Sequence, residues 1–308
     1  MILESSDYME LDLLDKWQTY SNRLKIFYKY GTKAAITDFS ILLGGYVSSN
    51  YYTSEGNALK NRTGWWWTKT PYLNPYHDDE YIITLDGDCD WCGVNLNKGG
   101  IRPALSYSSI KSIVLNTVIG ANGIKEIEYG EYPQEIVDEN YSHELERAYN
   151  NKNLRTTGKN YTTDSVKYQD AHISFKPRTH TEYEYNGQKY IRFVGDLNGD
   201  GEVMSDGRRI KNGEIYWVKV EPITWLVDEE QNIAITKKII VSGIQFDNER
   251  KYNGDFKNTD MYKFMNTYLI KDIFDNISIK KEEDNNKEFV SIDNKIKILR
   301  RRIDDIRK

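Results

Sequence analysis

The spacing of hydrophobic and polar residues changes several times along the chain, and each change marks a predicted element. Residues 8–30 carry apolar side chains every three or four positions, which predicts an amphipathic helix. Residues 64–105 alternate over short runs separated by turn residues such as Asp86-Gly87, which predicts small strands and a hairpin. The apolar positions of the predicted helix are Leu13, Trp17, Tyr20, Leu24 and Phe27.

Strand-like runs dominate the second part of the chain. The pair Asn186-Gly187 separates two alternating runs and predicts a hairpin turn. Residues 215–228 and 232–246 are expected to continue the same sheet. The polar stretch 151–180 is expected to be irregular.

Three further helices are predicted in this part. Residues 142–149 form the first, with Ser142 as its N-cap, and Asp260 opens the second. The third, at 290–308, carries a seam of apolar residues with Arg and Lys around it, and it either docks on the rest of the chain or pairs with a second copy. The residues of this seam are Ile292, Ile296, Leu299, Ile303 and Ile306.

A Gly/Asn cluster at 120–123 interrupts two periodic segments and predicts a boundary. The chain is then divided into a helix-plus-strand half at 1–119, a strand-rich half at 124–279, and a charged linker with the terminal helix at 280–308. The expected fold class is α+β, with short strands and flanking helices.

Composition narrows the possible functions. The 308 residues carry a formal net charge of −5, without the basic excess of a general nucleic-acid binder. The sequence has no apolar run of membrane-spanning length, and its N-terminus is acidic, so we expect a soluble, cytoplasmic protein. Aromatic residues make up 13% of the chain, and Tyr and Trp are enriched at binding surfaces.

The run Gly64-Trp65-Trp66-Trp67-Thr68-Lys69-Thr70-Pro71, followed by Gly100-Ile101-Arg102-Pro103-Ala104-Leu105, resembles a functionally uncharacterised family of low-GC bacteria and their phages. In that family a WWLRSP-like stretch precedes a variable segment and a VRPAL-like strand. Here Trp67-Thr68-Lys69 replaces Leu-Arg-Ser, so the arginine of the family pattern is missing.

The second half of the chain carries the family's other motifs. Residues 129–134 (YGEYPQ) resemble its opening GSYPQ strand, residues 220–225 (VEPITW) its EPIxW strand, and residues 261–269 its FMN-containing helix. The resemblance covers roughly residues 30–275, but the closing half comes first. The chain is either one permuted domain or two partial modules in tandem.

The same pattern resembles the C-type-lectin fold shared with formylglycine-generating-enzyme-like domains and with diversified phage and bacterial binding proteins. In those proteins the segment between the Trp motif and the RPA strand displays variable side chains on a rigid scaffold. The resemblance implies a recognition surface for a protein or glycan partner within residues 72–98. Its candidate contact residues are Tyr72, Tyr76, His77, Asp90, Trp91, Asn95 and Asn97.

Two motifs leave other chemistry open. Cys89 and Cys92 form a C-x-x-C, which is either a redox pair, half a zinc site with His77 as the nearest imidazole, or two ordinary thiols. No cofactor is expected otherwise, apart from calcium. Asp196, Asn198 and Asp200 match the first half of a calcium loop, but position twelve is Gly207, so an acidic hairpin loop is the alternative.

The sequence therefore favours a non-catalytic binding protein, possibly phage-encoded and directed at a host protein, that displays a polar and aromatic surface. The alternative from another class is an enzyme that uses Cys89 and Cys92 or an acid–base cluster around His180. A third hypothesis is an assembly subunit that pairs through residues 290–308.

Overall fold

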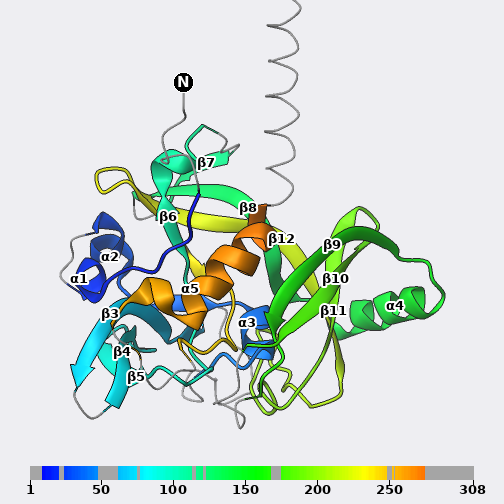
Figure 1. Ribbon diagram of the computed structural model, residues 1–308. Helices are drawn as coiled ribbons and strands as arrows, with labels where there is room; N and C mark the ends of the chain where they lie inside the picture. The colour runs from blue at the N-terminus through cyan, green and yellow to red at the C-terminus, as the bar shows by residue number, and fades with distance from the viewer. Residues whose placement is uncertain are drawn as a thin grey trace, which may run out of the picture.

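The chain folds into an α+β structure in which strands predominate and the helices are short (Figure 1). The computed structural model describes residues 9–20, 24–47, 62–74, 77–112, 116–120, 123–167, 175–247, 252 and 254–274. No helix within this part of the chain is long and apolar enough to cross a membrane. The helix and the self-pairing predicted at 290–308 lie outside the described residues.

The largest sheet has eight strands in the order β6-β13-β12-β11-β10-β9, with β8 paired to β12 and β7 paired to β8. Its longest strands are β8 and β12, which run antiparallel to each other. The strands of this sheet are β6 (Ala104–Ser106), β7 (Asn116–Ile119), β8 (Lys125–Ile136), β9 (Arg155–Asp164), β10 (Pro177–Tyr185), β11 (Gln188–Val194), β12 (Ile215–Asp228) and β13 (Ile233–Thr236).

Strand β12 changes its neighbour at its middle. Its first part pairs with β11 and its last part with β13, while β8 pairs along its other edge. Pro222 lies between the two parts, where the missing N–H breaks no ladder with β11 or β13. The Gln134 side chain donates to the carbonyls of Glu221 and Pro222 at 3.0 and 2.8 Å, which holds the irregular stretch against β8.

Two three-stranded sheets complete the structure. One has the order β14-β1-β2 and consists of β1 (Ala34–Ile36), β2 (Thr63–Gly64) and β14 (Lys238–Ile239). The other, called the small sheet below, has the order β3-β4-β5. Its strands are β3 (Trp66–Asn74), β4 (His77–Ile83) and β5 (Cys89–Gly93), so the strands and the Asp86-Gly87 hairpin predicted here are confirmed.

The two predicted halves of the chain share sheets and a core. Strand β6 pairs with β13, and β1 lies parallel to β14. One hydrophobic cluster runs from Leu11 to Phe274. The boundary expected at 120–123 is the turn between β7 and β8, where the Gly120 N–H donates to the Ile124 carbonyl at 2.8 Å. The halves therefore do not pack as separate units.

The helix predicted over residues 8–30 is wrong in its extent. The structure has two short helices, α1 (Lys16–Tyr20) and α2 (Lys25–Tyr30), and Asp12 pairs with Ala104 like a strand residue. Two 2.8 Å backbone hydrogen bonds hold this pair, so tertiary pairing outweighs the helical period.

The other helices agree better with the sequence. Helix α4 (Glu139–Asn150) starts three residues before the predicted helix, because Asp138 is the N-cap and accepts a hydrogen bond from the Tyr141 N–H. Helix α5 (Asp260–Phe264) starts where predicted and continues through a π-helical turn at Met265–Leu269. A further helix, α3 (Asp38–Leu42), is entirely buried.

The hairpin predicted at Asn186-Gly187 is confirmed. Strands β10 and β11 flank it, and both turn residues have positive φ, as this turn type requires. The irregular structure expected over 151–180 is wrong for residues 155–164, which form β9. Its first part, which includes Arg155, is largely exposed and polar, and the pairing with β10 makes it a strand.

Residues of the family-like motifs lie mostly in the core. Trp66 and Trp67 are buried, and the Trp225 indole donates to the Tyr129 carbonyl at 2.8 Å. The guanidinium of buried Arg102 donates to the Thr236 carbonyl at 2.7 Å and lies over the Trp66 ring. These residues therefore build the scaffold.

A buried ion pair joins segments that are far apart in the sequence. Asp38, at the start of α3, is 0% exposed, and its carboxylate accepts a 2.7 Å hydrogen bond from the equally buried Arg62. It also accepts from the backbone N–H groups of Ser205 and Ile136, at 2.6 and 3.2 Å, and from the Ser205 hydroxyl. One carboxylate thus connects α3, the segment before β2, the end of β8 and the loop before β12.

We expect Asp38→Ala to lower the free energy of unfolding by about 3–5 kcal/mol, since it leaves the Arg62 guanidinium buried without its partner. Chemical denaturation measures the change. As a control, Glu230→Ala removes the exposed ion pair with Lys25 and should change stability little. Equal effects of the two substitutions would contradict this role of Asp38.

Candidate functional site

The small sheet presents aromatic rings on one face. Because successive strand residues point to opposite faces, the register partners Tyr81 and Trp91 share a face. Tyr72 lies beside both, stacked on Trp91 at 5.2 Å between ring centroids and edge-on to Tyr81 at 5.2 Å. The Lys16 ammonium lies 3.4 Å from the Tyr81 centroid and 4.8 Å from that of Trp17. Trp17, Tyr72, Tyr81 and Trp91 are called the aromatic stripe below.

Short backbone contacts fix α1 on the small sheet and so place Trp17. The Lys16 N–H donates to the Thr70 hydroxyl at 2.8 Å, and the Lys69 N–H donates to the Leu14 carbonyl at 3.0 Å. Trp17 is therefore held beside strands β3 and β4 even though its ring is 53% exposed.

The aromatic stripe is a surface feature. Among the described residues, the exposed aromatic side chains are Trp17, Trp91 at 47% and Tyr46 at 40%, and all three lie around the small sheet. None of the four stripe residues belongs to either of the buried hydrophobic clusters that the structure describes. The stripe therefore contributes little to the core and remains available for contact with another molecule.

Strand β5 is an edge strand, so alternate backbone groups point away from β4. The Trp91 N–H donates to Oδ1 of the preceding Asp90 at 2.9 Å. The carboxylate thus occupies a donor that could otherwise pair with another strand.

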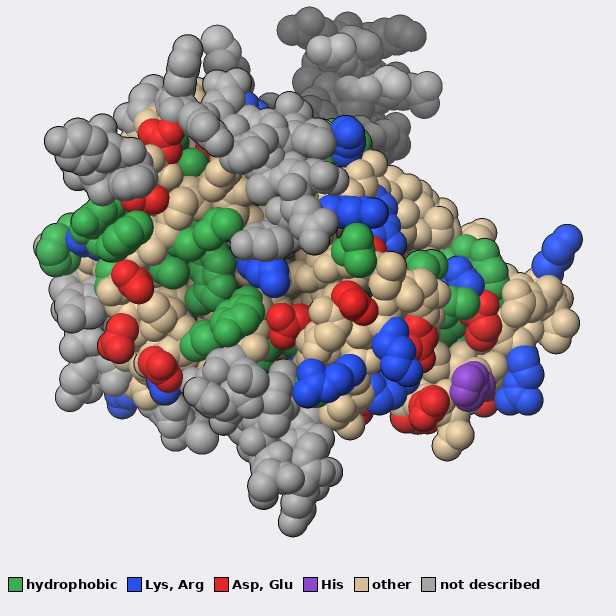
Figure 2. Space-filling view, turned by 90° about the horizontal axis from the view of Figure 1, so that it is seen from below, with side chains coloured by type: hydrophobic (Ala, Val, Ile, Leu, Met, Phe, Trp, Pro, Cys, Tyr) green, Lys and Arg blue, Asp and Glu red, His purple; other side chains and the backbone are tan. Residues whose placement is uncertain are grey.

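A pocket lies on the opposite face of the small sheet, where Ile82 and its register partner Asp90 point. Its volume is about 420 Å³. It is called the Tyr46 pocket below, and it is lined by Tyr46, Trp65, Ile82, Thr84, Leu85, Asp86, Asp90, Trp91, Cys92, Leu96 and Lys98. Figure 2 shows hydrophobic side chains gathered on the half of the molecule that carries the small sheet, with acidic residues beside them.

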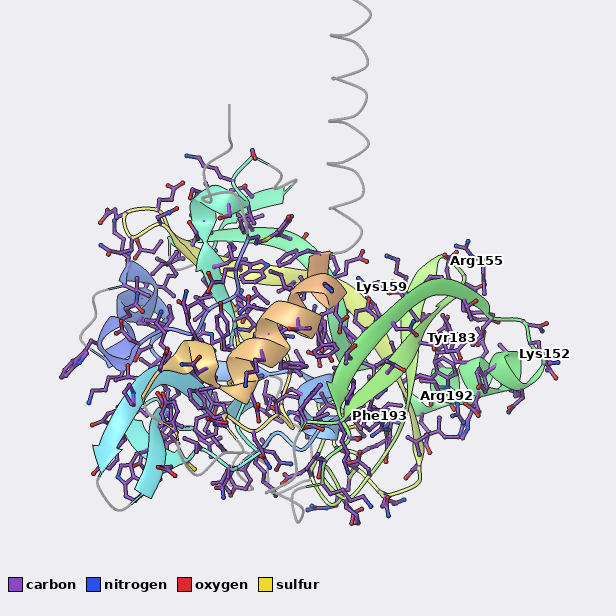
Figure 3. The ribbon with its side chains drawn as sticks, viewed as in Figure 1. Lys152, Arg155, Lys159, Tyr183, Arg192 and Phe193 are labelled. Carbon is purple, nitrogen blue, oxygen red and sulfur yellow. The ribbon has the colours of Figure 1, made fainter. Side chains whose placement is uncertain are left out.

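The other half of the molecule presents mainly charged groups that bond to each other. Figure 3 shows Arg155, Tyr183 and Arg192 on the lobe made by β9–β11 and α4. Arg192 binds Glu146 through two hydrogen bonds of 3.0 and 2.9 Å, and Arg155 pairs with Glu184. Tyr183 packs against Trp217 in a small separate cluster. These contacts stabilise the lobe itself.

The structure brings three of the predicted contact residues, Tyr72, Asp90 and Trp91, to the small sheet. Asn95 is half-buried just after β5, whereas Asn97 is 2% exposed and donates to the Val166 carbonyl at 3.5 Å, so it does not reach the surface. Tyr76 lies outside the described residues, and for His77 only the backbone, at the start of β4, is described.

Sequence reasoning missed Trp17, Tyr46, Trp65 and Tyr81 as surface residues of this region. The helical period assigned Trp17 to the buried face, and Trp65 was grouped with its two buried neighbours. The signal that could have identified Tyr81 is its position in the hairpin, since it is the register partner of Trp91.

The C-x-x-C motif is spread over both faces of strand β5. Cys89 and Cys92 are three positions apart, so their side chains point to opposite faces and cannot form a disulfide while the strand is intact. Burial raises the pKa of both thiols, that of Cys92 to about 11. A reactive thiolate needs the opposite shift.

His180 lies in the core, between aromatic rings. It is stacked on Phe193 and edge-on to Phe39, and its Nε2 is hydrogen-bonded to the Thr163 hydroxyl at 2.8 Å. Burial, with a smaller contribution from Arg178, lowers the pKa of His180 to about 3. The nearby Glu182 accepts its 2.5 Å hydrogen bond from Tyr161.

The loop with the calcium-like pattern uses its oxygen atoms internally. Asp196 binds Arg178 at 2.6 Å, and Asp200 accepts a hydrogen bond from the Asn212 N–H at 2.9 Å. The Asn198 amide is buried and donates to the Val166 carbonyl at 3.0 Å. Across the described residues, no group of three or more His, Cys, Asp and Glu side chains is placed to hold a metal ion.

Comparison with other proteins adds no relative: no family model, curated protein or solved structure matches this chain. The interpretation of the site therefore rests on its own geometry.

We expect both thiols to react slowly with alkylating agents at neutral pH. In a Cys89→Ser variant, the remaining Cys92 should titrate with an apparent pKa of about 11 because it is buried. The rate of iodoacetamide labelling against pH measures this value, with the denatured protein as control. An apparent pKa below the ordinary thiol value of about 8.5 would contradict the prediction and support a reactive cysteine.

The small sheet also holds a buried acid, Glu80 of β4, which is 0% exposed. Neither of its carboxyl oxygens has a hydrogen-bond partner of good geometry. Burial raises the pKa of Glu80 from 4.5 to about 9, while the nearby Tyr252 hydroxyl lowers it by a smaller amount. The side chain is therefore a neutral acid at neutral pH.

Because the folded-state pKa of Glu80 is the higher one, its contribution to stability is fully present below pH 4.5 and is lost as the pH rises towards 9. Glu80→Gln keeps the shape and stays neutral. Its stability relative to the natural chain should increase between these pH values, by about 1.4 kcal/mol for each pKa unit at most. Urea denaturation at several pH values measures the difference, and a constant difference would contradict the buried neutral acid.

Proposed function

We propose that the protein is a non-catalytic binding protein that presents the small sheet to a protein or glycan partner. The observation that carries this proposal is the position of the exposed aromatic residues. Trp17, Tyr46 and Trp91 lie around one three-stranded sheet, and the rings of the aromatic stripe contact each other and lie outside the buried clusters.

The stripe has the physical properties of a binding surface. Its rings offer large apolar area with polar edges, and stacking of Tyr72 on Trp91 fixes their orientation before a partner arrives. Ordering of side chains on binding costs free energy, so rings that are already held in place bind at lower cost.

The division between scaffold and surface supports the same function. Trp66, Trp67 and Arg102, from the motifs on either side of residues 72–98, are buried. The intervening segment contributes Tyr72, which is half-buried, and Trp91, which is exposed. On this basis we also propose a C-type-lectin-like arrangement, and a phage or mobile-element origin with a host protein as partner follows from the family resemblance.

The structure favours no catalytic role for the residues of the alternative hypothesis. The thiols of Cys89 and Cys92 lie on opposite faces with raised pKa values. His180 is enclosed by Phe39 and Phe193 and bonds to Thr163, so its environment is that of a core residue.

A double substitution in the stripe tests the proposal. Tyr72→Ala/Trp91→Ala should weaken binding to a glycan array or to a bacterial host protein by about 30-fold or more, since loss of a central aromatic contact costs about 2 kcal/mol. The matched control, Val118→Ala/Ile119→Ala, truncates two exposed apolar side chains on β7 and should bind like the natural chain.

Near-ultraviolet circular dichroism confirms that both variants are folded. Equal binding by the stripe variant and the natural chain would overturn the proposal, as would the absence of any partner for the natural chain in both assays.

A further inference from the structure

We propose that the Tyr46 pocket is a separate site for a neutral saccharide of one or two sugar rings. The proposal rests on the proposed binding function but concerns the opposite face of the small sheet from the aromatic stripe. Its volume of about 420 Å³ is within the range of small-molecule pockets, about 300–1,000 Å³.

Both ends of the pocket are held by rigid backbone. Trp65 packs edge-on against buried Trp67 at 5.1 Å, and this packing requires glycine at position 99, where a Cβ atom would lie 2.6 Å from the Trp65 ring. On the other side, the Tyr46 N–H donates to the Lys98 carbonyl at 3.4 Å, and Val47 bridges to β2. The two rings are therefore in place before a ligand binds.

The lining combines apolar surface with both kinds of hydrogen-bonding group. Trp65, Ile82 and Leu96 supply apolar surface, and Tyr46 adds a ring with a hydroxyl group. The carboxylates of Asp86 and Asp90 accept hydrogen bonds, the Lys98 ammonium donates them, and Thr84 does both.

This combination selects against other ligand classes. A phosphate or carboxylate ligand would meet the two carboxylates with one ammonium to offset them, and a cation would meet Lys98. An apolar ligand would leave the polar lining groups without partners, which costs free energy. A sugar ring fits because its hydroxyl groups both donate and accept, while its C–H face is apolar and can lie against an aromatic ring.

Asp90 shows how the ligand would be oriented. Its Oδ1 accepts the Trp91 N–H at 2.9 Å, which fixes the carboxylate on β5. A fixed acceptor gives direction to a hydroxyl group, whereas a mobile one would first have to be ordered. Asp90→Asn keeps an oxygen for the Trp91 N–H but removes the charge and changes what the ligand meets.

Saturation-transfer NMR and calorimetry with neutral disaccharides (maltose, cellobiose, lactose and chitobiose), glucuronate and choline test this site. At least one neutral sugar should bind with a dissociation constant of about 10 mM or lower. Tyr46→Ala and Asp90→Asn should each weaken that binding about tenfold or more, or about 1.4 kcal/mol. Trp17→Ala/Tyr72→Ala, on the other face, should leave it unchanged.

The saccharide proposal is overturned if none of the neutral sugars binds, if glucuronate or choline binds in their place, or if neither pocket substitution weakens binding. These results are separable from the stripe experiment. If Tyr72→Ala/Trp91→Ala still loses its partner, only the saccharide site fails. If that variant keeps its partner while Tyr46→Ala loses the sugar, the stripe fails and the pocket stands.

Discussion

The arrangement of the whole chain depends on one buried carboxylate. Asp38 accepts hydrogen bonds from the Arg62 side chain, from both polar groups of Ser205 and from the Ile136 N–H. A charge in the core is tolerated when its hydrogen-bonding capacity is filled, and here four donors from three segments fill it. The same carboxylate lies beside Glu135, whose pKa burial and Asp38 raise to about 7. The pair therefore fixes α3 and the β8 end with respect to each other, and it links the two parts of the chain that the sequence separates.

Much of the sheet could be predicted from local sequence, because hairpins depend on neighbouring residues. Asn186-Gly187 and Asp86-Gly87 have the backbone freedom that their turns need, and the alternating runs beside them form strands as expected. Long-range pairing could not be predicted. The N-terminal segment gives up its helical period where Asp12 pairs with Ala104, and β9 forms from a polar stretch because β10 lies beside it. Neither partner can be identified from a local window of sequence.

The candidate site was predicted in part, for the same reason. Trp91 and Tyr72 belong to the segment that the family resemblance marks as variable, and both reach the small sheet. Trp17 and Tyr46 come from segments that pack against the sheet only in three dimensions. Asn97 shows the converse: a polar residue in the same segment is buried because the Val166 carbonyl needs a donor. Composition indicates which residues suit a surface, and tertiary packing decides which ones reach it.

The parallel pairing of β1 with β14 has a consequence for synthesis of the chain. Ala35 and Lys238 are partners although about 200 residues separate them in the sequence. Such distant contacts slow folding, since a large loop must close before they stabilise anything. On the ribosome, the N-terminal segment must wait until residue 239 has emerged before its sheet can form. Its apolar side chains remain exposed for that interval, so the nascent chain has a long period in which chaperones can act on it.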